Sequence, residues 1–351
     1  MGLLESRYLV RYATIIAVLG VLGYMGKKIT HHYTKEDPVN EYNAVKQYLL
    51  TDSPMFGDNK PKLWIHSKYE VNARKWRDFG SRNTTDLNQP YLHLTIQSII
   101  RHCSKDFHIL LIDDDSFGKL LDDWDVNLST ISEPEKEHWR QFALSKLILK
   151  YGGMIVPNSF ICVKNLKEMW KFGTTTNKPF VLESINSTGA IVLKSKFIPD
   201  MLFFGCKEAQ SPQVFEFMRF LYKRCMSAKN ISSVEGEFGG DVQNWLAIAH
   251  HRGIFEVLSG EYIGIKNNKN QPILIENWME QSDVELSDNY FGIYIPADLF
   301  LKRPKYQWFT VMNTEDILKS KMILSKYIRK ATLDTSSLEP ENIEKSKVGG
   351  I

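Results

Sequence analysis

Apolar positions in the middle of the chain change from a helical period to a short continuous run. Trp139, Ala143 and Leu147 recur at helical spacing, which predicts an amphipathic helix that opens at 132–135 and ends where Gly152 can take a left-handed turn. The apolar run 154–156 follows directly and predicts a buried strand. Residues 157–159 then fall at the carboxyl end of that strand, where open α/β sheets bind ligands.

The same two patterns alternate along much of the chain. Further strands are expected at 61–66, 108–112, 180–183 and 190–193, and 160–163 reads as an extension of the strand at 154–156. Further helices are expected at 92–103, 164–170 and 317–327. Strands that alternate with helices predict an α/β protein with a Rossmann-type sheet flanked by helices.

Three consecutive aspartates, Asp113, Asp114 and Asp115, follow the predicted strand 108–112. At the carboxyl edge of a sheet these carboxylates could accept hydrogen bonds from a ribose or base, or Asp113 and Asp115 could hold a metal ion. Alternatively, Asp115 or Ser116 caps the next helix and the remaining carboxylates are solvated. The sequence leaves both interpretations open.

The motif Tyr151-Gly152-Gly153, followed by three mostly apolar residues and then Pro157 and Ser159, resembles the DXD sugar-binding glycosyltransferases. That family includes initiation-type mannosyltransferases and capsular polysaccharide synthesis proteins. The opening run 61–66 resembles the first strand of the same family. The resemblance implies a GT-A-like fold and a nucleotide-sugar donor, with these donor-binding residues: His66, Asp113, Asp114, Asp115, Tyr151, Gly152, Gly153, Asn158 and Ser159.

The charged atoms that the family uses are missing from the matching positions. Pro157 and Ser159 stand where the family has two aspartates that hold Mn²⁺ or Mg²⁺ against the donor diphosphate, and neither is a good ligand for a hard cation. Gln141 and Leu144 stand where the preceding helix of the family carries an acid and an arginine. Positive charge would then come from Lys146, Lys150 or Lys164, or from a metal ion on residues 113–115.

No catalytic residue is fixed by these patterns, although four acids are candidates: Asp113, Asp114, Glu183 and Asp241. Glu183 ends a predicted strand and could serve as an acceptor-side base. Asp241 follows Gly239 and Gly240 at a predicted helix start, where the glycines could let backbone amides approach a phosphate and Asp241 would serve as helix cap or as ligand.

The N-terminal stretch 8–25 is apolar apart from Arg11, and about 20 such residues span a bilayer. We expect a membrane-anchor helix in 1–28, a polar stem in 29–60, a glycosyltransferase-like domain in 61–330 and a disordered tail in 331–351. A cleaved signal peptide is the rival interpretation. The N-terminal pattern at Gly2 also fits myristoylation.

Charge and cysteine content narrow the possible partners. The net charge is +3, from 44 basic and 41 acidic residues, and no basic stripe with interleaved aromatics lies outside the last helix and tail, so a nucleic-acid partner is not expected. The 4 cysteines lack paired spacing, which indicates free thiols. Asn-x-Ser/Thr sequons weakly favour a lumenal body, and they begin at Asn83, Asn127, Asn186 and Asn230.

Two function classes remain. The first is a single-pass membrane glycosyltransferase, in an ER- or Golgi-like lumen or associated with a virus, that transfers a hexose to a glycan or glycoprotein acceptor with atypical or no metal dependence. The second is an inactive relative that keeps the fold as a structural or binding component. Sequences with Val-Pro-Asn-Ser at 156–159 are similar to those of large DNA viruses, so a virus particle is one setting for the second class.

Overall fold

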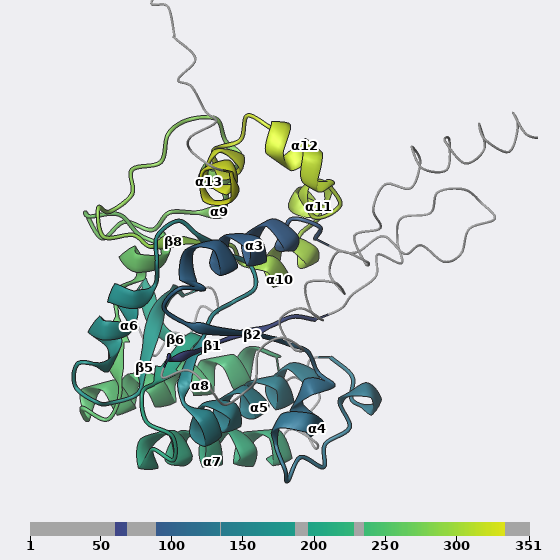
Figure 1. Ribbon diagram of the computed structural model, residues 1–351. Coiled ribbons are helices and arrows are strands. Elements are labelled where there is room, and N and C mark those ends of the chain that lie inside the picture. Colours follow the sequence, from purple (N-terminus) through teal and green to yellow (C-terminus); the bar gives the residue numbers. More distant parts are fainter. Residues whose placement is uncertain (1–59, 69–88, 134, 187–195, 228–234, 334–351) are drawn as a thin grey trace, which may run out of the picture.

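The computed structural model describes residues 60–68, 89–133, 135–186, 196–227 and 235–333 (Figure 1). The expected membrane anchor, Gly2, all of the stem but its last residue, the strand at 190–193 and the tail beyond residue 333 lie outside these ranges. No helix among the described residues is long and apolar enough to cross a membrane.

A six-stranded sheet with the order β2-β1-β3-β6-β5-β7 forms the centre of the fold. Only β6 runs against its neighbours β3 and β5, while the other pairings are parallel. A mixed sheet of this kind flanked by helices fits the expected GT-A-like α/β fold. The strands are β1 (Lys62–His66), β2 (His108–Ile112), β3 (Gly153–Ile155), β5 (Phe180–Ile185), β6 (Phe197–Cys206) and β7 (Glu256–Leu258).

Helices cover both faces of this sheet (Figure 1). One face packs on α4 (Ser116–Leu120), α5 (Glu135–Tyr151), α7 (Pro212–Ser227) and α8 (Glu235–His251). The other face packs on α3 (Leu92–Cys103) and α6 (Lys167–Thr174).

A third apolar cluster lies on the outer side of α3. It joins the small sheet of β4 (Phe160–Cys162) and β8 (Gly292–Tyr294) to the C-terminal helices. Those helices are α9 (Ile275–Met279), α10 (Ala297–Lys302), α11 (Gln307–Thr310), α12 (Thr314–Lys319) and α13 (Ile323–Thr332).

The predicted joint between α5 and β3 is confirmed. Trp139, Ala143 and Leu147 are buried, and Gly152 ends the helix with a positive φ of 65°. Gly153 has a φ of 97°, and a Cβ there would lie 2.4 Å from the carbonyl oxygen of Lys62. Two glycines are therefore required where the chain leaves the helix and enters the centre of the sheet.

Two expectations about the elements are wrong, and one strand was not expected. Residues 160–163 do not extend β3, because the chain turns at Pro157, whose carbonyl accepts a hydrogen bond from the Phe160 N–H (3.1 Å), and β4 then pairs with β8. The expected helix 317–327 is broken at Ser320, where the backbone is extended, so that α12 and α13 are separate. Strand β6 is not predicted at all.

Candidate functional site

Two neighbouring cavities lie at the edge where the parallel strands β1, β2 and β3 end. We call them the Lys68 cavity and the Asp115 cavity; their volumes are about 160 Å³ and about 560 Å³. Successive residues at the end of β1 separate them, because His66 and Lys68 line the first and Ser67 lines the second. The predicted ligand-binding edge of the sheet is therefore hollowed on both sides of this segment.

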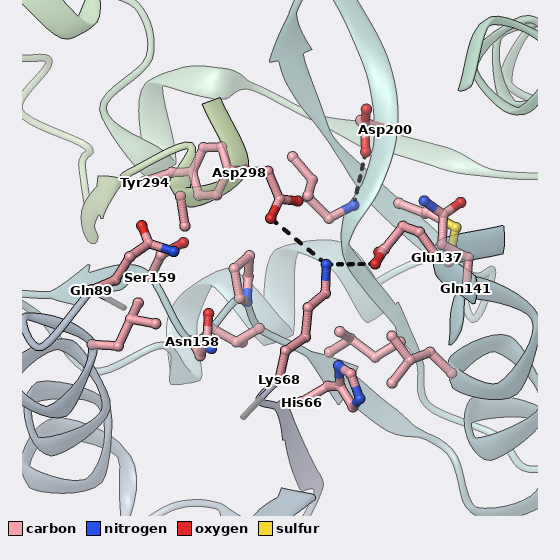
Figure 2. A pocket seen from close by; sticks show the side chains of 18 of the residues that line it. His66, Lys68, Gln89, Glu137, Gln141, Asn158, Ser159, Asp200, Tyr294 and Asp298 are labelled. Carbon is pink, nitrogen blue, oxygen red and sulfur yellow. Dashed lines mark hydrogen bonds and ion pairs between the residues drawn. The ribbon is translucent and has the colours of Figure 1, made fainter. Parts of the chain in front are cut away.

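The Lys68 cavity is lined by charged groups from segments far apart in the sequence (Figure 2). The Lys68 ammonium lies 2.5 Å from a Glu137 carboxylate oxygen and 3.7 Å from an Asp298 carboxylate oxygen. Burial alone would lower the pKa of Lys68, but the two carboxylates outweigh burial and raise it. Burial alone would likewise raise the pKa of Glu137, yet Lys68 holds it below its ordinary value. Both groups are therefore charged at neutral pH.

Asp200 on β6 adds a third carboxyl group to this cavity. Its oxygens accept hydrogen bonds from the Leu202 N–H (3.0 Å) and from the Gln243 side-chain amide (3.0 Å). Burial raises the pKa of Asp200, and these two hydrogen bonds only partly offset that effect. A carboxyl group of raised pKa in a cavity is typical of functional sites, where it can take up or release a proton.

His66 lines the Lys68 cavity and Asp114 lines the Asp115 cavity, and both side chains are in one cluster with Arg140. The Asp114 carboxylate lies 3.0 Å from His66 Nε2 and accepts two hydrogen bonds from Arg140, at 2.9 and 2.7 Å. Burial alone would raise the pKa of Asp114, but the contacts with His66 and Arg140 hold it well below its usual range. The sequence-predicted residues His66 and Asp114 are thus brought together, and their first partners are each other and Arg140.

The neighbouring aspartates have different surroundings. Asp113 accepts hydrogen bonds from the Ser116 N–H (3.0 Å) and hydroxyl (2.5 Å) at the start of α4. Asp115 makes no side-chain capping bond, although it stands at the cap position of that helix. Asp115 is exposed and lines the Asp115 cavity. The capping role expected for Asp115 or Ser116 is therefore performed by the Asp113–Ser116 pair.

Residues 157–159 line the Lys68 cavity, but they do not fit the metal ion that the resemblance implies. Pro157 has no ligand atom, and the buried Ser159 hydroxyl donates a hydrogen bond to the Ile295 carbonyl at 2.7 Å. The Asn158 amide donates to the Ser67 hydroxyl at 3.1 Å. Within the described ranges, no group of three or more His, Cys, Asp or Glu side chains is placed to hold a metal ion. Asp113 and Asp115 are therefore not part of such a group.

Three of the predicted donor-binding residues lie away from both cavities. Tyr151, Gly152 and Gly153 precede β3 or begin it, so they lie at the edge of the sheet opposite Asn158. The Tyr151 hydroxyl donates a hydrogen bond to the Leu120 carbonyl (2.6 Å). The Gly152 carbonyl accepts one from the Trp64 indole (3.0 Å). These residues join helix to sheet and are not part of either cavity's lining.

Two catalytic candidates also have structural partners. Glu183 pairs with the buried Lys266 at 2.5 Å and accepts a hydrogen bond from the Gly260 N–H at 2.9 Å. Asp241 lies inside α8 and pairs with Arg224 of α7. The expected helix start at Asp241 is wrong, because α8 begins at Glu235 and buries Phe238 ahead of the glycines.

The lysines proposed as alternatives to a metal ion lie elsewhere. Lys146 pairs with Asp123 (2.8 Å) and Lys150 with Asp122 (2.6 Å). The Lys164 ammonium donates to the Asp288 carbonyl (3.0 Å). None of the three lines the Lys68 cavity.

The sequence does not single out Lys68, Glu137, Arg140, Asp200 or Asp298 as site residues. A signal exists for two of them, because Glu137 and Arg140 are an acid and an arginine three residues apart in α5. They lie one helical turn before Gln141 and Leu144, the positions that the resemblance indicates. No local pattern marks the other three, which tertiary structure alone brings to the site.

Comparisons with known proteins include a distant structural similarity. No family model matches the chain, and no curated protein matches it. Among solved structures, the chain is similar to one titled PaToxG glycosyltransferase, with 12% sequence identity, a TM-score of 0.33, and coverage of 64% of this chain and 81% of that chain.

Proposed function

We propose that this protein is a glycosyltransferase-like protein that binds a nucleotide-sugar across the two cavities. The nucleoside occupies the Asp115 cavity and the hexose occupies the Lys68 cavity, so that the diphosphate passes the segment 66–68. An enzyme of this kind transfers the hexose to a glycan or glycoprotein acceptor. The observation that carries the proposal is the pair of polar cavities on either side of Ser67, at the carboxyl edge of the parallel strands.

The lining of the Asp115 cavity suits a nucleoside. Asp115 and Ser129 offer polar atoms to ribose hydroxyls, and Trp124 offers an aromatic surface near a base. Lys136 also lines this cavity and adds a positive charge. A ligand with a planar base, hydroxyls and phosphate uses all three kinds of group.

The lining of the Lys68 cavity suits a hexose. Carboxylates accept hydrogen bonds from sugar hydroxyls and an amide can also donate them, and Glu137, Asn158 and Asp200 are placed to do so. For transfer, a group must also take the proton of the acceptor hydroxyl as it attacks the sugar. Asp200 is the candidate, because burial raises its pKa and it borders the same space.

The second function class, an inactive binding module, is favoured by a different observation. Asp114 is engaged by Arg140 and His66, and Pro157 and Ser159 supply no charge where the resembled family has carboxylates. Such a protein would bind a nucleotide-sugar without turning it over.

A turnover assay separates the two classes. The full chain is incubated with UDP- and GDP-hexoses, and release of the nucleoside diphosphate is measured with and without a mixture of glycan acceptors. The enzyme interpretation predicts slow release that Asp200→Asn lowers at least tenfold, while Asp122→Asn, an exposed control on the Lys150 pair, leaves it unchanged. Binding without release would support the binding module.

A further inference from the structure

We propose that the Lys68 ammonium is the resident cation of this cleft and makes nucleotide-sugar binding independent of a divalent metal ion. The inference rests on the proposed function, because it assigns the group that meets the donor diphosphate. It starts from the disagreement between the metal ion that the resemblance implies and the residues that the structure places at 157–159.

Lys68 is held in place by carboxylates from two separate helices. Its ammonium is 2.5 Å from Glu137 on α5 and 3.7 Å from Asp298 on α10. Figure 2 shows this ammonium between the two carboxylates, with Asn158 and Asp200 around the same space. The side chain is 24% exposed, so the charge is fixed in position while one side remains open to a ligand.

The two carboxylates need a cation between them. Carboxylates that converge without one repel each other, and a metal ion or an ammonium group relieves that repulsion. The ammonium group has three N–H donors, and the two carboxylates do not use all of them. A phosphate oxygen that enters the cavity can therefore accept a hydrogen bond from Lys68, and positive charge beside a leaving diphosphate stabilises it as bond cleavage proceeds.

The Lys68 cavity is a poor binding site for a divalent metal ion. Asn158 and Ser159 bond to Ser67 and to the Ile295 carbonyl, and Pro157 offers no side-chain ligand. The fixed ammonium would repel an added cation at short range. The cleft therefore has a positive charge supplied by the chain where the resembled family relies on a metal ion.

The test compares the full-length wild type with Lys68→Met and Lys68→Arg. Binding of UDP- and GDP-hexoses is measured by calorimetry, once in EDTA and once in Mn²⁺. The affinity of the wild type is expected to agree within about twofold in the two buffers. Lys68→Met is expected to lower the affinity tenfold or more, and Lys68→Arg to retain most of it. Lys171→Ala removes an exposed lysine of α6 that pairs with Glu168 and serves as the matched control.

A second measurement needs no nucleotide-sugar. Lys68→Ala leaves the carboxylates of Glu137 and Asp298 facing each other without a cation, so this variant is expected to bind Mn²⁺, followed by electron paramagnetic resonance, where the wild type does not. If Lys68→Met does not fold, Asp298→Asn replaces it. That exposed carboxylate competes for the ammonium, and its removal is expected to tighten donor binding threefold or more.

The outcomes separate the two proposals. Donor binding that EDTA abolishes, or that Lys68→Met and Asp298→Asn leave unchanged, overturns the role of Lys68 and leaves the proposed function standing. Wild type that binds no nucleotide-sugar in either buffer overturns the proposed function and the donor role of Lys68 together.

Discussion

Arg140 donates two parallel hydrogen bonds to the Asp114 carboxylate, from Nε to Oδ1 at 2.9 Å and from a terminal nitrogen to Oδ2 at 2.7 Å. The pair joins the second turn of α5 to the segment that follows β2. The Arg140 side chain is 6% exposed and that of Asp114 is 28% exposed, so solvent screens the interaction only in part. This ion pair holds in place Asp114, which lines the Asp115 cavity.

Replacing Arg140 is expected to destabilise the protein substantially. Arg140→Met removes one partner and leaves the Asp114 carboxylate without its main compensation, which costs about 3 kcal/mol of unfolding free energy. Arg140→Lys recovers little, because an ammonium cannot reproduce the two parallel bonds. Urea unfolding measures the loss, and Lys171→Ala on an exposed pair should change stability by no more than about 0.5 kcal/mol. If Arg140→Met lowered the unfolding free energy no more than Lys171→Ala does, the ion pair would not be an important contribution to stability.

The same pair predicts an acid-dependent loss of stability. The pKa of Asp114 is lowered by folding, so its stabilisation is complete above the unfolded-state pKa of about 3.9 and is lost as pH falls through the lower folded-state pKa. The unfolding free energies of wild type and Asp114→Asn are measured from about pH 3 to about pH 6, a range that includes the unfolded-state pKa. The difference between the two proteins should shrink as pH falls. A constant difference between them across that range would contradict the prediction.

Asp200 should show the opposite sign. Its pKa is raised by folding, so its contribution to stability is most favourable at low pH and declines as pH rises above about 3.9, the unfolded value. Asp200→Asn removes the cost of a buried charge and is expected to add about 1 kcal/mol of unfolding free energy at neutral pH. The substituted amide can donate to the Gln243 side-chain oxygen, which is buried and without a hydrogen bond, once that amide rotates. If Asp200→Asn destabilised the protein at both acidic and neutral pH, the buried Asp200 carboxylate would not be a cost to stability.

Two glycine substitutions should have opposite effects on stability. Gly153→Ala places a Cβ 2.4 Å from the Lys62 carbonyl oxygen at a φ of 97°, and is expected to cost about 2–4 kcal/mol. Gly239→Ala lies within α8 and its Cβ meets nothing within 4 Å, so it should gain about 0.5–1 kcal/mol. Thermal unfolding of both variants checks the pair, and a tolerated Gly153→Ala would show that the α5–β3 joint can move.

The sequence predicts the parts of the fold where burial has a clear period. The stripe of Trp139, Ala143 and Leu147 and the strands β1, β2 and β3 are of this kind, and the carboxyl edge of the sheet follows from them. Strand β6 lacks such a signal, because Pro199 and Asp200 interrupt its apolar run. The single antiparallel strand of the sheet, and with it Asp200, therefore emerges only in three dimensions.

Nearness in sequence is a poor guide to membership of the site. Tyr151 and Gly152 are close to Asn158 along the chain, yet β3 separates them, since three strand residues span about 10 Å. Lys68 and Asp298 are far apart in sequence and meet in one cavity. Tertiary packing sets both the separation and the contact, and a motif along the chain predicts neither of them.

The most direct test of the central claim is a calorimetric titration of the full chain with UDP- and GDP-hexoses, comparing wild type with Asp115→Asn and Asp122→Asn. Asp115 is exposed and lines the Asp115 cavity, where we propose that the nucleoside binds, so its substitution should weaken binding about tenfold through one lost hydrogen bond to the ligand. Asp122, which pairs with Lys150, should have no effect. Absence of binding by the wild type, or equal affinity of all three proteins, would contradict a nucleotide-sugar site at this edge of the sheet.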